Sequence, residues 1–112
     1  MGAPLVLRGT LTEDARGRTG RDGMADLTLR MLTRAGALGT GVPAQAHKLY
    51  GTGHAAQAAR DARLRQLRRG LRVEVQGTGD LRRGRIVMEA DQIITPDVFD
   101  ARALASGSEA TA

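Results

Sequence analysis

The sequence predicts a mainly β domain, a small closed barrel of five strands with one helix between the third and fourth strands. Three observations predict this fold class. Short runs with alternating apolar and polar residues occur along most of the chain. A segment rich in alanine and arginine at 54–69 contains neither glycine nor proline and lies between two such runs. The runs are separated by glycine-rich connections that suit one small domain.

The first two strands follow from this alternation. Residues 5–12 place leucines on one face and polar side chains on the other, and Gly9 lies where a barrel strand can bend. Residues 13–23 combine glycines with arginines, a composition typical of an exposed loop. Residues 25–33 alternate again and predict the second strand.

The third strand and the helix come next. After a glycine-rich connection at 35–41, residues 42–50 predict the third strand, although Pro43 lowers the strand propensity. Residues 54–69 predict a helix that stops at Gly70, with arginines near its negative end. Its inward stripe is expected to consist of Ala56, Ala59, Arg63 and Leu67.

The remaining strands complete the barrel. Residues 71–76 predict the fourth strand, 77–84 a hairpin loop and 85–94 the fifth strand. The expected domain therefore covers residues 1–96. Residues 97–112 are expected to be a flexible tail, because they end in small and polar residues.

The charge of the chain points to a polyanionic partner. The formal net charge is +5, the sequence pI is about 11.2, and every basic residue except Lys48 is arginine. Such a surface favours nucleic acids, because neutralised phosphates release condensed counterions. The arginine, alanine and glycine content could also reflect GC-rich coding, which leaves this inference open.

Other classes of function find little support. The chain has no cysteine, and its two histidines, His47 and His54, lack metal-binding spacing, so we expect no metal, cofactor or catalytic site. Residues 51–56 match G-x-G-x-x-A with Glu74 downstream, but the strand before them is too polar for a dinucleotide-binding fold. Without an apolar leader or membrane span, we expect a cytoplasmic protein.

Four segments carry a resemblance to a known family. Five strands with a helix after the third is the order of the oligonucleotide-binding fold, a Greek-key barrel. The segments 4–11, 48–51, 69–77 and 88–93 resemble the bacterial single-stranded DNA-binding proteins and the related primosomal replication protein B. The resemblance covers about residues 4–95.

The resemblance implies a non-catalytic protein that binds single-stranded DNA in replication, repair or recombination. It also implies a homodimer or homotetramer with replication proteins as possible partners. The family's main member carries an acidic tail that ends in Pro-Phe, whereas this chain ends at 106–112 in small residues and a single glutamate. This favours the primosomal type or an accessory paralogue.

Candidate binding residues follow from the resemblance and from the charge. Tyr50 matches a position where a ring contacts bases, whereas Ala44 lies near a place where the family commonly carries a stacking tryptophan. Arginines in two predicted loops and three further cations of the barrel surface complete the set. The full set is Tyr50, Arg82, Arg83, Arg85, Arg16, Arg18, Arg21, Lys48, Arg30 and Arg8.

Several alternatives remain open at this point. Tyr50 could be a core ring, and any single arginine could belong to a solvated surface. The helix arginines, from Arg60 to Arg69, are interpreted mostly as a solvated face. RNA cannot be separated from DNA as the ligand. The alternative of a different class is a protein-interaction module that oligomerises or docks on a replication partner and binds nucleic acid weakly or not at all.

Overall fold

The computed structural model describes residues 2–33 and 41–96. The predicted tail at 97–112 and nearly all of the predicted connection at 35–41 lie outside the described residues. The elements in chain order are β1 (Ala3–Leu11), β2 (Arg16–Thr19), β3 (Met24–Thr33), β4 (Pro43–Thr52), α1 (His54–Gln66), β5 (Arg72–Arg82) and β6 (Arg85–Ile94).

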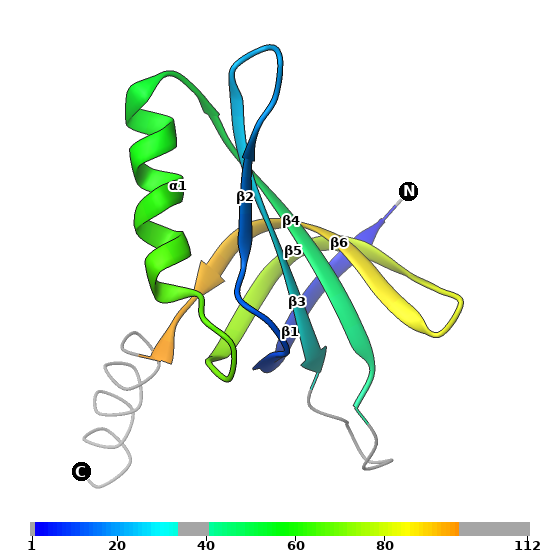
Figure 1. The fold of residues 1–112 in the computed structure, drawn as a ribbon. Coiled ribbons are helices and arrows are strands. Elements are labelled where there is room, and N and C mark those ends of the chain that lie inside the picture. The colour runs from blue at the N-terminus through cyan, green and yellow to red at the C-terminus, as the bar shows by residue number, and fades with distance from the viewer. Residues whose placement is uncertain (1, 34–40, 97–112) are drawn as a thin grey trace, which may run out of the picture.

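The strands form one sheet that closes on itself (Figure 1). The strand order is β1-β5-β6-β4-β3-β2, and β1 also pairs with β3. All pairs are antiparallel except β4 with β6, which is parallel. The predicted fold class, mainly β, is confirmed. Residues 2–33 and 41–96 contain one helix, α1, which lies beside β2 in Figure 1.

The closure of the sheet depends on Gly9. This residue is opposite Val73 of β5 and opposite Thr33 of β3, so β1 passes between two partners here. A Cβ atom at Gly9 would collide with the carbonyl oxygen of Leu32. Only glycine allows the two backbones to approach this closely, in line with the bend expected at this position.

The core is aliphatic and follows the predicted alternation. Leu27, Leu29 and Met31 of β3 are almost fully buried, as are Val73 and Val75 of β5. Each such side chain contributes about 1.5–3 kcal/mol by leaving water. These residues fix which faces of the strands point inward, and the polar residues between them point outward.

The predicted loop at 13–23 contains a sixth strand that alternation could not indicate. Residues Arg16–Thr19 form β2, in which every side chain is exposed, and pair with β3 from Thr28 to Ala25. Main-chain hydrogen bonds define this strand, and no side chain of it is buried. A segment of glycine and arginine therefore shows no alternation from which the strand could be predicted. The sheet therefore has one strand more than predicted.

The predicted loop at 77–84 is wrong over most of its length. Strand β5 continues to Arg82, and the turn consists of Arg83 and Gly84, both with positive φ. Gly77 suggested a loop, but a Cβ atom there would collide with the carbonyl oxygen of Glu89 in β6. This glycine is needed because β5 and β6 approach each other closely here, and it does not form a turn.

The helix is shorter than predicted and packs differently. It ends at Gln66, and the next residue, Leu67, is completely buried. Ala59, expected on the inward stripe, is exposed, and Arg60 is the buried residue of α1. In the part of the chain that the structure describes, no helix is long and apolar enough to cross a membrane.

Candidate functional site

A polar network lies on the outer face of β3, β4 and β6. Within β4, Ala44 and Ala46 are buried, so the intervening positions, among them His47, point away from the core. The register places His47 opposite Thr28 of β3 and beside Glu89 of β6. The sheet thus presents side chains of three strands on a single face.

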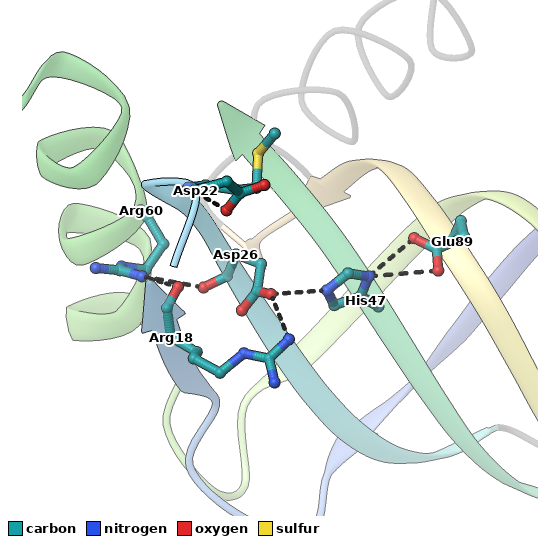
Figure 2. A network of polar contacts seen from close by, with 7 residues as sticks. Arg18, Asp22, Asp26, His47, Arg60 and Glu89 are labelled. Atoms are coloured by element: carbon teal, nitrogen blue, oxygen red, sulfur yellow. Dashed lines mark hydrogen bonds and ion pairs between the residues drawn. The ribbon is translucent and has the colours of Figure 1, made fainter. Parts of the chain in front are cut away.

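His47 connects two carboxylates of this face (Figure 2). Its Nε2 lies 3.1 Å from Oδ2 of Asp26, and its Nδ1 lies 3.0 Å from Oε2 of Glu89. The guanidinium of Arg18 in β2 lies 3.3 Å from the same oxygen of Asp26. Both ring nitrogens can donate only in the imidazolium form, so the geometry suits protonated His47.

The pKa values shift in the directions that this geometry requires. Burial lowers the pKa of His47, but hydrogen bonds and the charges of Asp26 and Glu89 outweigh burial and raise it above 6.5. Burial likewise raises the pKa of Asp26, and His47 and Arg18 outweigh this effect, so the pKa falls below 3.8. Each partner therefore favours the charged form of the other.

Arg60 holds the main chain behind this network. Its side chain is only 9% exposed and its Nη1 donates to the carbonyl oxygens of Arg18 and Asp26, at 2.6 and 3.2 Å. Other donors of the guanidinium bind Thr19 and Asp61. The expectation of a solvated face is wrong for this arginine, which fixes β2 and β3 beneath the helix (Figure 2).

Six of the eight predicted arginines lie on two separate hairpins, whereas Arg8 lies in β1 and Arg30 lies farther along β3. Arg21 lies in the turn between β2 and β3, and Arg83 lies in the turn between β5 and β6. Pairing of Met24 with Thr52 places the first turn near the end of β4, whereas pairing of Ala44 with Ile86 places the second near its start. At about 3.3 Å per residue, the hairpins lie on the order of 25 Å apart along β4.

Most of the predicted cations already have an acidic partner. Arg21, Arg83 and Arg85 have no ion pair among the described residues. The paired ones are Arg16 and Arg30 with Glu13, Arg18 with Asp26, Arg82 with Asp80, and Arg8 with Glu74. All these arginine side chains are well exposed, but Asp26 and Glu74 are buried, whereas Glu13 and Asp80 are partly exposed. Exposed pairs contribute little, so a phosphate could replace the carboxylates of Glu13 and Asp80.

Tyr50 and Lys48 form a pair close to the core. The Tyr50 ring packs against the core cluster, and burial raises the pKa of its hydroxyl, which the nearby Arg63 partly offsets. Lys48 Nζ lies 5.3 Å from the ring centroid and donates to the carbonyl oxygen of Asp91 at 2.7 Å. Ala44, which lies near the place where the resemblance implies a tryptophan in the family, is buried.

Sequence reasoning did not identify the network of Asp26, His47 and Glu89. The outward position of each was readable from alternation, but their proximity depends on the strand register, and β4 and β6 are adjacent only through a long-range parallel pairing. In residues 2–33 and 41–96, no group of histidine and acidic side chains suits a metal ion.

Comparisons with known proteins identify the fold. No family model and no curated protein matches the sequence. The second single-stranded DNA-binding protein of Mycobacterium smegmatis superposes with a TM-score of 0.61 and 11% identity, covering 85% of this chain and 89% of that one. The small single-stranded DNA-binding protein of Streptomyces coelicolor superposes with a TM-score of 0.58 and 18% identity, covering 85% of this chain and 93% of that one.

A third match comes from a longer protein. The single-stranded DNA-binding protein of Thermus aquaticus gives a TM-score of 0.55 and 23% identity over 86% of this chain, which spans only 40% of that one. At these identities the likeness is one of fold. The closed sheet with α1 beside it has the oligonucleotide-binding fold of bacterial single-stranded DNA-binding proteins.

Proposed function

We propose that this protein binds single-stranded DNA without catalysis and serves DNA replication, repair or recombination. One observation carries the proposal: the fold shared with three single-stranded DNA-binding proteins presents arginines on both hairpins that flank one sheet face. A fold does not by itself determine a function, so the proposal also depends on the arginines, which can bind phosphates.

The strand would be held mainly through its phosphates. Arg21, Arg83 and Arg85, which have no ion pair within the described ranges, can donate to a phosphate directly. Arg16, Arg30 and Arg82, whose acidic partners are partly exposed, would exchange carboxylates for phosphates. Arg18 would keep its contact to Asp26 and bind a phosphate through other donors of its guanidinium. We assign no contact to Tyr50, Lys48 or Arg8, which are engaged with the core, the main chain and Glu74.

Association of copies would strengthen such a site. We propose a homodimer or homotetramer, since one DNA strand shared by several small sheets gains affinity through effective concentration. Replication proteins are the expected partners, and a location in the cytoplasm follows from that role. RNA would satisfy the same phosphate contacts.

The test is fluorescence anisotropy with a labelled mixed-sequence oligonucleotide of about 30 nucleotides, a length that exceeds the site of one such domain. We expect binding at low salt that weakens steeply as salt is added. No binding with micromolar protein at low salt would contradict the proposal. It would favour the protein-interaction module. The ion pairs that already occupy five of the predicted arginines are consistent with that alternative.

A further inference from the structure

We propose that the sheet face between the hairpins selects bases that carry an exocyclic amino group, cytosine over uracil or thymine, with Glu89 as the specificity-determining residue. The inference rests on the proposed function and concerns the part of the interface that lies between the two arginine hairpins. It follows from charge, from the lack of a tyrosine, phenylalanine or tryptophan ring on the described part of this face, and from the donors and acceptors that the face presents.

The centre of the face does not suit a phosphate. The carboxylates of Asp26 and Glu89 lie on either side of His47, and the Glu89 side chain is 67% exposed. Even with His47 protonated, the two negative charges only balance His47 and Arg18. Free arginines lie on the hairpins at both ends, so phosphates are favoured there and bases are left to cover the centre.

The centre also offers no tyrosine, phenylalanine or tryptophan ring for stacking among the described residues, and both nitrogens of the His47 ring are engaged by Asp26 and Glu89. Tyr50 packs inward against the core with Lys48 over its ring. Beside Glu89 on the same side of β6 lies Val87, which is 39% exposed. A base here would rest on an aliphatic side chain, so hydrogen bonds at its edge would discriminate between bases more than stacking does.

The available hydrogen-bonding group is an acceptor. Both oxygens of Glu89 face Nδ1 of His47, at 3.3 and 3.0 Å, and this contact leaves other lone pairs of an exposed carboxylate unused. An ionised carboxylate only accepts, so it pairs with the N4 amino group of cytosine. Uracil and thymine present the O4 acceptor at that position, and two acceptors repel each other.

His47 acts as a positioning residue in this arrangement. It holds the carboxylate of Glu89 from one side and is itself held by Asp26 on the neighbouring strand. The fixed orientation reduces the side-chain entropy that Glu89 would lose on contact with a base. An exposed glutamate without such a partner would discriminate less.

The experiment compares oligo-dC with oligo-dU of equal length, because the two bases differ at only two neighbouring positions. Cytosine has an N4 amino group and an N3 acceptor, whereas uracil has an O4 acceptor and an N3–H donor. Anisotropy titrations at neutral pH should show tighter binding of oligo-dC, by roughly tenfold for one hydrogen bond to a charged acceptor. Glu89→Gln should bring the two affinities together, since an amide can both donate and accept. Asp91→Asn removes the same charge from the same strand without a contact to His47 and should preserve the ratio.

Three results would overturn the inference. If wild-type protein binds both oligonucleotides equally or prefers oligo-dU, Glu89 does not select bases, although the proposed function stands. If Glu89→Gln strengthens both ligands by the same factor and leaves the preference intact, the carboxylate acts only by repelling phosphates. If neither oligonucleotide binds to wild-type protein, the proposed function itself fails, and the selection with it.

Discussion

At the scale of single residues, His47 makes the least ordinary set of contacts in the described chain. It joins strands β3 and β6 across β4 by contacts to Asp26 and Glu89 that are both satisfied only when the ring is protonated. The network is therefore sensitive to pH near neutrality, where a histidine changes its charge.

The stability of the fold should fall as pH rises through the pKa of His47. Because the folded-state pKa is raised above 6.5, the contribution of protonated His47 is fully present below 6.5 and is lost above the folded-state pKa. Urea unfolding should give wild-type protein a higher free energy of unfolding at about pH 6 than at about pH 8.5, by on the order of 1 kcal/mol.

The matched variant for this prediction is His47→Gln, which cannot titrate. Its free energy of unfolding should differ less between the two pH values than that of wild-type protein. Asp26, whose pKa is lowered, loses its contribution only under acid conditions and does not interfere in this window. An equal difference in both proteins would show that another group causes the pH dependence.

At the scale of elements, α1 holds the outer hairpin through a polar contact. Arg60 is the buried residue of the helix, and its guanidinium binds the main chain of both β2 and β3. Strand β2 has no buried side chain of its own. The hairpin that carries Arg16, Arg18 and Arg21 therefore depends on this arginine for its position.

Replacing Arg60 should destabilise the protein more than replacing any exposed arginine of the helix. Arg60→Ala leaves two carbonyl oxygens without their donor and should cost about 2–4 kcal/mol in urea or thermal unfolding. Arg65→Ala, in the same helix at an exposed position, should change stability by less than about 0.5 kcal/mol. Similar losses in both variants would contradict the structural role of Arg60.

The hairpin of β5 and β6 depends on glycine. Gly77→Ala would place a methyl group against the carbonyl oxygen of Glu89, and the backbone cannot move aside as a side chain can. The free energy of unfolding should therefore fall by about 3 kcal/mol. Gly20→Ala is the control, because the added Cβ atom would meet only the end of the flexible Asp22 side chain, and the free energy of unfolding should fall by less than about 1 kcal/mol. Equal effects would mean that close approach at Gly77 is unimportant.

Elements were predictable from the sequence where burial creates a pattern. The alternation in β1, β3 and β6 identified strands with the correct inward faces, since a leucine or methionine at every second position has few other uses. Strand β2 was missed because its backbone pairs without burying a side chain. The network of Asp26, His47 and Glu89 was missed because it depends on register across three strands.

At the scale of the whole molecule, the net charge of +5 leaves arginines without an ion pair in two regions of the described chain. Arg21, Arg83 and Arg85 lie at the hairpins, and the others, Arg63, Arg65, Arg69 and Arg72, lie in α1 or between α1 and the start of β5. Figure 1 shows the hairpin of β5 and β6 pointing away from α1. A strand that crosses the face between the two hairpins would meet phosphate-binding groups at its ends and acceptors at its centre.

This arrangement predicts how the salt dependence of DNA binding responds to charge removal. Combined Arg82→Ala, Arg83→Ala and Arg85→Ala should weaken binding and reduce the slope of log K against log salt by about 2, since each phosphate contact contributes about 0.7 for a single strand. The control combines Arg65→Ala, Arg68→Ala and Arg69→Ala, which removes the same net charge at and beyond the end of α1, away from the hairpin. If both variants reduce the slope equally, overall charge and not the hairpin governs binding. If only the control reduces it, the phosphates follow the helix side of the molecule, and the face between the hairpins is not the path of the strand.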